Sequence, residues 1–339
     1  HFKHGSSSNN IRGIWFNNLC GGEIHSKEIK LIMKTLLQRV IQDKEVNLYP
    51  VWLMRQAGRY MPVYMEMKAN SDGFLDMAMT PWKAAEITMQ PIYEFDMDCA
   101  IIFSDILVVN HALGQELDYN PSPILGPYSP SFFDTSIEEF VENCEPVYAA
   151  IEIVRDVLDD SKSLIGFAAA PYTICKYMCG EQNLEVVQKL VPYIIEHLER
   201  QIEAGCDTVQ IFDSHAGDIS EEDFEAFVMN PTKLIVDHIR NLYPEVCIIA
   251  FPRLVGLKIN DYIEYVNPDA INISDDLPVD KINGEVIQGG ISVKRLIKGE
   301  DITPVLNKMK DRPYVVNLAH GIDKTTPMEH VRQLVNTVK

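Results

Sequence analysis

Short apolar runs alternate with longer helix-like stretches along most of the chain. Eight runs rich in aliphatic and aromatic residues are predicted to be strands, and they span residues 49–54, 99–103, 164–168, 208–212, 246–251, 270–273, 286–288 and 314–318. Each is nearly continuous in apolar residues, which is typical of parallel strands that are covered on both faces. Because each run is followed by helical or helix-length sequence, the pattern favours an α/β fold that is a single (β/α)8 (TIM) barrel.

The stretches between the strands carry apolar residues three and four positions apart, as amphipathic helices do. Helices are predicted over residues 184–204, 221–242 and 328–338. Thr80-Pro81 and Thr326-Pro327 each place a capping residue before a proline, so helices are expected to begin at Pro81 and Pro327. An open Rossmann sheet is disfavoured because no Gly-x-Gly-x-x-Gly follows an early strand, and no Walker loop is present either.

Composition and charge exclude several classes of protein. An apolar fraction of 46% over 339 residues indicates a globular chain, and 49 acidic against 30 basic residues give a formal net charge of -19. This charge argues against a general nucleic-acid binder, which needs a basic face for the phosphates. No stretch approaches the roughly 18 uninterrupted apolar residues of a membrane span. Neither nucleic acid nor a membrane is therefore an expected partner.

The start of the chain differs from the rest. It is polar and rich in glycine and serine, so we expect a flexible N-terminal extension over residues 1–30: a cloning remnant, a processed leader or translated upstream sequence. The barrel domain is expected over residues 31–339. Seven scattered cysteines indicate reduced thiols, and the cytoplasm is the expected location, or an organelle if a transit peptide has been trimmed. Cys175 and Cys179 are only two thiols, so no metal site is expected.

Active sites of (β/α)8 barrels form at the barrel mouth, where the strands run into the loops that follow them. The first predicted strand leads into Arg55 and Arg59, two guanidinium groups that can bind carboxylates or phosphates through paired hydrogen bonds. A loop with solvated charges is the alternative, and we favour an anion site. The second strand leads into Asp105, a lone carboxylate among apolar or small residues, which is costly without a donor. The hydrogen-bond donor is either another group of the protein or a group on a ligand. The sequence does not distinguish between these two possibilities.

Three further strand ends carry polar side chains. The third strand leads to Tyr177, the fourth into Ser214 and His215, and the eighth into His320. A serine hydrolase would present its nucleophile in Gly-x-Ser-x-Gly, which is absent. A direct role for His215 is less favoured than a structural one.

Several of these segments together resemble the uroporphyrinogen decarboxylase family. Residues 50–62 read Pro-Val-Trp-Leu-Met-Arg-Gln-Ala-Gly-Arg-Tyr-Met-Pro and match the family signature almost letter for letter. Residues 101–109, 166–173, 212–217 and 317–321 are similar to its further motifs in order and spacing. The resemblance implies a distorted barrel that is usually homodimeric. It also implies a cofactor-free carboxy-lyase of haem biosynthesis, which converts the four acetates of uroporphyrinogen III to methyl groups and yields coproporphyrinogen III and CO2.

The resemblance also implies which residues meet the substrate. By position, they are Arg55, Gln56, Ala57, Gly58, Arg59, Lys68, Asp105, Tyr177, Ser214 and His320. Asp105 would bond the pyrrole N–H groups, and Lys68 stands where the family commonly has arginine. Catalytic roles would fall on Asp105, Arg55 and Arg59. Arg55, or a water that it holds, would deliver protons while Arg59 grips a carboxylate, or the two roles would be reversed.

The expected chemistry suits these residues. A substrate with eight carboxylates would be repelled by a chain of net charge -19 unless positive charge is concentrated locally. No pyridoxal or thiamine motif supplies an electron sink, but a pyrrole serves as its own sink once a ring carbon is protonated. An ionised Asp105 would stabilise the cation that forms.

Two rival functions and one departure from the family pattern bear on this hypothesis. A methyltransferase of the same superfamily requires His-x-Cys and a later cysteine as zinc ligands, whereas His215 is followed by Ala216 and Gly217. A non-catalytic tetrapyrrole-binding barrel, or an assembly partner, predicts loss of Asp105 or of the arginines, and these are present. The sixth and seventh strand ends, residues 272–274 and 288–292, differ from the usual family sequence.

Overall fold

Seven parallel strands form one sheet in the computed structural model, which describes residues 33–120 and 122–339. The extension expected over residues 1–30 lies outside the described part. The strands of the sheet, in spatial order, are β1 Cys99–Ile101, β4 Ser163–Ala169, β5 Thr208–Asp213, β6 Cys247–Pro252, β7 Ala270–Ile273, β8 Ile287–Gly289 and β9 Tyr314–Val315. Neighbours in the sheet are also neighbours in the chain apart from one inserted hairpin, as expected for repeated βα units.

The first predicted strand closes this sheet into a barrel. Val51 forms a parallel bridge with Val316, directly after β9, and the Val316 N–H donates to the Pro50 carbonyl over 2.9 Å. On its other side, the Val51 carbonyl accepts the Asp98 N–H at 3.0 Å, at the entrance to β1. The (β/α)8 barrel is therefore confirmed. The eighth position is a bridge rather than a regular strand, because Pro50 has no N–H to extend the ladder.

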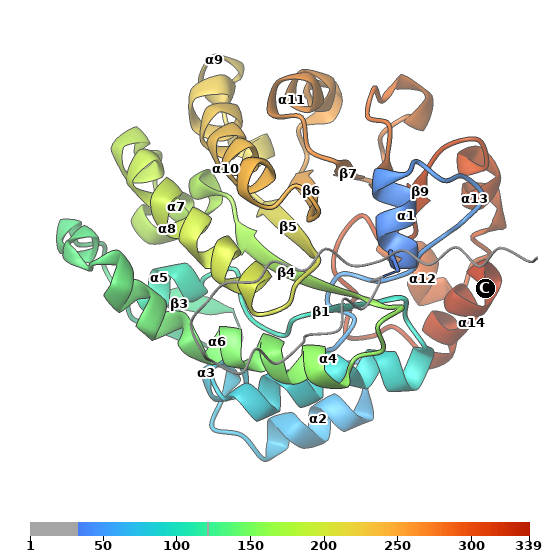
Figure 1. The fold of residues 1–339 in the computed structure, drawn as a ribbon, viewed down its shortest axis with the longest axis horizontal. Helices are drawn as coiled ribbons and strands as arrows, with labels where there is room; N and C mark the ends of the chain where they lie inside the picture. The colour runs from blue at the N-terminus through green and yellow to red at the C-terminus, as the bar shows by residue number, and fades with distance from the viewer. Residues whose placement is uncertain (1–32, 121) are drawn as a thin grey trace, which may run out of the picture. The chain divides into compact units, whose positions relative to one another are not determined.

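A layer of helices surrounds the strands (Figure 1). The α-helices are α1 Leu36–Gln42, α2 Pro62–Ala69, α3 Phe74–Ala78, α4 Pro81–Phe95, α5 Val108–Ala112, α6 Ile137–Val157, α7 Pro171–Cys179, α8 Leu184–Glu203, α9 Glu221–Phe224, α10 Asn230–Leu242, α11 Ile259–Val266, α12 Val293–Lys298, α13 Thr303–Met309 and α14 Met328–Val338. In this layer α4 packs on α6, α6 on α8, α8 on α10 and α10 on α11, and α14 packs on both α12 and α4. None of these helices is long and apolar enough to cross a membrane.

Most of the helix predictions are confirmed, with two differences. Helix α4 begins at Pro81 as expected, and α14 covers the predicted residues 328–338, but α14 does not begin at the expected Pro327, which keeps an extended ψ of 134°. The helix expected over residues 221–242 contains a π-helical turn, Glu225–Met229, between α9 and α10. Pro231 follows this turn and cannot donate the hydrogen bond that a regular α-helix needs there.

The long segment between β1 and β4 contains a hairpin that the sequence pattern did not predict. Strand β2, Leu117–Tyr119, pairs antiparallel with β3, Pro123–Leu125, and the hairpin is flanked by α5 and α6. Two three-residue strands give too little alternation to recognise. The hairpin brings Tyr119 toward the strand ends, as described below.

One end of the barrel is filled and the other carries the polar strand ends. Helix α1 contacts β4, β6 and β9, and its buried side chains Leu37, Val40 and Ile41 pack in one apolar cluster with Trp52 and Cys99. This packing closes the end at which the strands begin. The opposite end, the barrel mouth, is therefore where the loops that follow the strands can form a site.

The barrel interior also holds a polar layer. The Trp52 indole N–H donates to Gln288 Oε1 at 3.0 Å, and Gln288 Nε2 donates to Gln210 Oε1 at 2.9 Å and to Asn272 Oδ1 at 3.0 Å. All four side chains are fully buried. Gly289 has φ +86°, and a Cβ there would lie 2.7 Å from Asn272 Oδ1. Asn272 and Gln288, the first residues of the two strand ends that depart from the family pattern, thus lie inside the barrel and are hydrogen-bonded to each other.

Candidate active site

The loop that carries Arg55 and Arg59 is held rigidly at the mouth. Gln56 is 1% exposed; its Nε2 donates to the Cys99 carbonyl at 3.0 Å and its Oε1 accepts the Leu53 N–H at 3.1 Å. The Tyr60 hydroxyl donates to the Gln56 carbonyl at 2.6 Å. Gln56 therefore holds the loop against β1, and its side chain is already occupied by these bonds rather than turned toward a ligand.

Arg55 adopts a backbone conformation that non-glycine residues rarely take. Its φ is +59°, in the left-handed region, which costs about 1–3 kcal/mol in typical cases. Its side chain is exposed, as is that of Arg59, while Ala57 and Gly58 are half-buried between them. Strain of this kind persists where the surrounding structure holds a functional side chain in place.

The loop after β9 packs directly on Arg55. The Ile322 N–H donates to the Met54 carbonyl at 2.9 Å, and a Cβ on Gly321 would lie 2.5 Å from Arg55 Cδ. Glycine at position 321 is thus required by the Arg55 side chain. His320, the preceding residue, lies close enough to Arg55 for the guanidinium charge to lower the pKa of the imidazole, although burial is the larger cause.

We expect Gly321→Ala to lower kcat/KM about 10- to 100-fold, because a displacement of roughly 1 Å in a positioning group has effects of this size. The added methyl group would push the Arg55 side chain from its position. Steady-state kinetics of the single variants and of Gly321→Ala combined with Arg55→Ala would test this. A further loss from Gly321→Ala when the Arg55 side chain is already absent would contradict the explanation.

Asp105 lies beside Arg55 and beneath the inserted hairpin. Its Oδ1 accepts the Leu107 N–H at 2.7 Å. Burial raises the pKa of the carboxyl, while the Leu107 N–H, the Tyr119 hydroxyl and the charge of Arg55 act in the opposite direction. One donor is therefore supplied by the fold, and the carboxylate retains acceptor capacity for a ligand.

Tyr119 is a residue of the site that the sequence pattern did not indicate. It ends β2, and its ring packs on Phe74 with centroids 4.6 Å apart. Its hydroxyl is buried without a hydrogen-bond partner in bonding geometry, yet it lies near enough to Asp105 to influence the pKa of that carboxyl. The charges of Asp105 and Tyr177 in turn raise the pKa of Tyr119, after burial.

The loops after β4 and β5 complete the mouth on the side of Tyr177. The Tyr177 ring meets the His215 ring edge to face, with centroids 5.2 Å apart. His215 Nδ1 lies 2.6 Å from Asp218 Oδ2, and the His215 N–H donates to Thr173 Oγ1 at 3.1 Å. These bonds favour a structural role for His215. Ser214, between His215 and β5, is half-buried.

Asp213 is a buried acid at the end of β5, directly before Ser214 and His215. Its Oδ1 accepts the Thr173 hydroxyl at 2.6 Å, whereas Oδ2 is buried without a partner. Burial raises the pKa of Asp213 to about 7. Asp213 is therefore linked through Thr173 to the loop that carries Ser214 and His215, because the Thr173 oxygen also accepts the His215 N–H.

Unpaired arginines gather at the mouth. Within residues 33–120 and 122–339, only Arg55, Arg59 and Arg253 have side chains without an ion pair or hydrogen bond. The remaining arginines of this part each bond a carboxylate or carbonyl oxygen, and they are Arg39, Arg155, Arg200, Arg240, Arg295, Arg312 and Arg332. All three unpaired arginines follow strand-forming segments at the mouth, in a chain of net charge -19. Such a set is suited to an anionic ligand.

The remaining predicted residue, Lys68, is placed differently. It lies exposed in the last turn of α2, and its side chain has no ion pair or hydrogen bond in the described structure. Among the described residues, no contact joins Lys68 to Asp105 or to His320. Arg59 lies closer to the mouth loops: the pKa of Asp323, in the loop after β9, is lowered mainly by hydrogen bonds from Thr325, and the charge of Arg59 contributes to the same shift.

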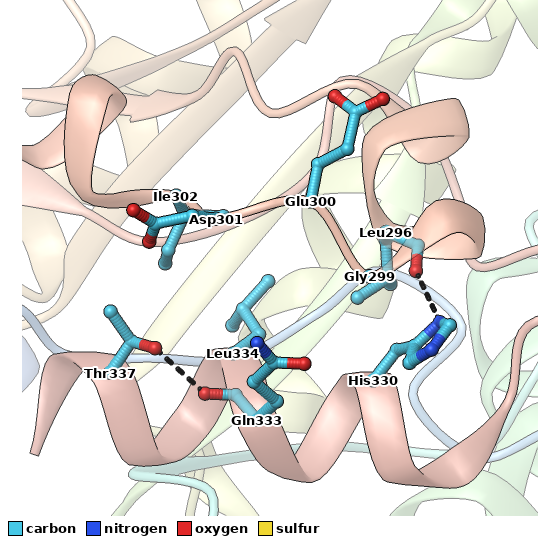
Figure 2. A pocket seen from close by; sticks show the side chains of 9 residues that line it. All are labelled: Leu296, Gly299, Glu300, Asp301, Ile302, His330, Gln333, Leu334 and Thr337. Atoms are coloured by element: carbon cyan, nitrogen blue, oxygen red, sulfur yellow. Dashed lines mark hydrogen bonds between the residues drawn. The ribbon is translucent and has the colours of Figure 1, made fainter.

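Two cavities lie away from these residues. One, of about 10 Å³, lies between α12 and α14 beside His330, whose Nδ1 is 3.2 Å from the Leu296 carbonyl (Figure 2). It has room for at most one water molecule. The other, of about 450 Å³, is lined by residues including Arg240 and Asp269, which form an ion pair at 2.9 Å where β7 begins. Among the residues that the structure describes, no group of His, Cys, Asp and Glu is arranged to hold a metal ion.

Comparison with known proteins decides the family. The family model described as Uroporphyrinogen decarboxylase (URO-D) matches residues 33–339. The chain belongs to the uroporphyrinogen decarboxylase family. Uroporphyrinogen decarboxylase from Erythrobacter litoralis is 36% identical over 91% of this chain and 99% of that protein. The enzyme of the same name from Rickettsia bellii is 38% identical over 86% and 95%, and that from Brucella anthropi is 34% identical over 91% and 99%.

A solved structure with low sequence identity to this chain shares the fold. A methyltransferase from Methanosarcina mazei aligns with a TM-score of 0.72 over 89% of this chain and 97% of its own, at 14% identity. At this level of identity the likeness concerns the barrel fold alone.

Proposed function

We propose that the protein decarboxylates the four acetate side chains of uroporphyrinogen III, giving coproporphyrinogen III and CO2 in haem biosynthesis. The observation that carries this proposal is the arrangement at the mouth: a recessed carboxylate, Asp105, with unpaired arginines around it. The substrate is complementary in charge and shape, since its pyrrole N–H donors face the centre of the macrocycle and its carboxylates lie at the periphery. Membership of the family supports the same reaction.

The proposed reaction needs no cofactor, because the pyrrole ring itself accepts electrons. A proton adds to the ring carbon next to the one that bears an acetate, so that positive charge reaches the acetate-bearing carbon, and the bond between the side-chain methylene and its carboxyl group then breaks. CO2 leaves, and the bonding electrons neutralise the ring cation. The methylene carbon next takes a proton while the ring proton is lost, so each acetate consumes one proton in total. Only the cationic stage has a charge that Asp105 would stabilise selectively, as catalysis requires.

The remaining residues would position the substrate. Arg55 would deliver protons, directly or through water, and Arg59 would bind a carboxylate, or the two roles would be exchanged. Ser214, Tyr177 and His320 would contact the substrate side chains, and Lys68 would hold a peripheral carboxylate. Ala57 and Gly58 would allow the macrocycle to approach the loop closely. A homodimer in the cytoplasm is part of the same proposal.

An anaerobic assay with freshly reduced uroporphyrinogen III tests the function. Products are oxidised and separated by carboxylate number, with an incubation without protein as the control for spontaneous oxidation. We expect conversion from eight carboxylates through seven, six and five to four without added metal or cofactor. Folded protein that yields no product with fewer than eight carboxylates would refute the proposal.

A further inference from the structure

Arg253 is the third unpaired arginine of the mouth, and the family resemblance assigned it no role. It follows β6 directly, and its backbone N–H donates to the Asp213 carbonyl at the end of β5 over 3.0 Å. The residue is half-buried. Its guanidinium makes no ion pair or hydrogen bond with the described residues, so its five N–H donors are available to a ligand.

The loop that carries Arg253 is fixed on the loop after β5. Leu254 has φ +60°, a rare conformation for a residue with a side chain. A Cβ on Gly217 would lie 2.5 Å from the Leu254 carbonyl oxygen, so glycine at 217 is what permits this close packing. The direction in which Arg253 leaves β6 is therefore determined by the backbone and not by contacts of its own side chain.

His320 follows β9 at the same rim of the barrel, and the charges of both Arg55 and Arg253 act on its imidazole. Burial is the largest cause of its lowered pKa; the two guanidinium groups lower it further, and a backbone bond with Gly321 acts in the opposite direction. Arg55 follows the segment that pairs beside β9, whereas Arg253 follows β6, with β7 and β8 between β6 and β9. The imidazole is thus exposed to positive charge from two separate parts of the barrel, with no carboxylate among the groups that influence it.

We infer that Arg253 and His320 together bind one side-chain carboxylate of the substrate. A carboxylate placed between them would give the guanidinium a paired acceptor and the imidazole a counter-charge. The inference rests on the proposed function for the identity of the ligand. It adds a binding residue on the β6 side of the mouth, apart from the loop of Arg55 and Arg59.

The first test is the kinetics of Arg253 variants with uroporphyrinogen III. Removing one charge-assisted, paired hydrogen bond is expected to raise KM of Arg253→Gln about 10- to 100-fold, with a smaller change in kcat. Arg253→Lys keeps the charge but loses the planar guanidinium fork, so its KM should lie between those of the wild type and Arg253→Gln. Arg295→Gln is the matched control, because Arg295 pairs with Glu300 and the Asp301 carbonyl on the outer helical layer. Circular dichroism would establish that each variant is folded.

The second test is the protonation of His320, which a purely structural role for Arg253 would leave unchanged. In the ligand-free protein, the pKa of His320 can be measured by NMR. Arg253→Gln should raise this pKa, because the substitution removes one of the two positive charges that act on the imidazole. Adding coproporphyrin III, the stable oxidised form of the expected product, should raise the pKa of His320 in the wild-type protein and raise it less in Arg253→Gln.

The outcomes separate the inference from the proposed function. If the wild-type protein converts uroporphyrinogen III while Arg253→Gln keeps the wild-type KM and His320 pKa, the inference is overturned and the function stands. If the wild-type protein converts none, the proposed function falls and takes the identity of this carboxylate with it. Wild-type conversion with the raised KM and the shifted imidazole supports both.

Discussion

An Asp105→Asn enzyme is expected to turn over uroporphyrinogen III about 10²- to 10³-fold more slowly than the wild type, which is the usual loss when one preorganised electrostatic group is removed. Asparagine has nearly the shape of aspartate and still offers an oxygen to the Leu107 N–H. It lacks the negative charge that would stabilise the protonated pyrrole. The loss should therefore appear mainly in kcat, since the charge acts on the transition state more than on the bound substrate.

Steady-state kinetics of Asp105→Asn beside Asp275→Asn would measure this effect. Asp275 is an exposed carboxylate after β7, so the control removes the same charge from the chain without touching Asp105. Turnover by Asp105→Asn within threefold of the control would rule out the role assigned to Asp105.

The pH dependence of the wild-type enzyme gives a second readout for Asp105. Activity requires the ionised carboxylate, so kcat should fall as the pH decreases through the pKa of Asp105. Because burial raises that pKa, the fall should begin at a higher pH than for an exposed aspartate. This acid limb should disappear in Asp105→Asn.

The second large effect is expected from Arg55→Gln, with kcat/KM lowered about 10²- to 10⁴-fold if Arg55 delivers protons, the range of general acid catalysis. Arg55 is the one residue whose charge reaches both Asp105 and His320. Arg55→Lys should recover only part of the loss, because an ammonium group lacks the planar fork.

The matched control for Arg55 is Arg39→Gln, since Arg39 pairs with Glu45 near the filled end of the barrel. A separate measurement distinguishes the two possible roles of Arg55. If Arg55 only anchors a carboxylate, KM rises while the pH profile of kcat stays unchanged; if it handles the proton, the profile changes. An Arg55→Gln enzyme with wild-type kinetics would exclude both.

Much of the fold followed from the sequence because its signals are strong and local. Continuous apolar runs and proline-started helices place the regular strands and α4 correctly, since burial on both faces leaves little room for polar residues. The β2–β3 hairpin and the π-helical turn were missed. The strands of the hairpin are too short to show the two-residue period of a β-strand. The π-helical turn depends on how a proline inside a helix is accommodated.

The sequence predicted those site residues that come directly after a strand-forming apolar run. Arg55, Arg59 and Asp105 were found by that rule, and Arg253 obeys it too, directly after Phe251-Pro252. Arg253 was not predicted, because Pro252 separates it from the apolar run over residues 246–251. Tyr119 could not be found in this way, because it reaches Asp105 through a hairpin inserted between two strands, and only tertiary packing brings them together.

The buried side-chain amides of the barrel have a consequence for how the strands can align. A slip of β8 by one residue would turn Gln288 away from the interior. The Trp52 indole N–H and the amide oxygens of Gln210 and Asn272 would then lose the partner that they share. Aliphatic side chains would tolerate such a slip, whereas these groups accept one alignment only. The polar layer thus specifies the register between neighbouring strands. That register determines which residues lie at the mouth of the barrel.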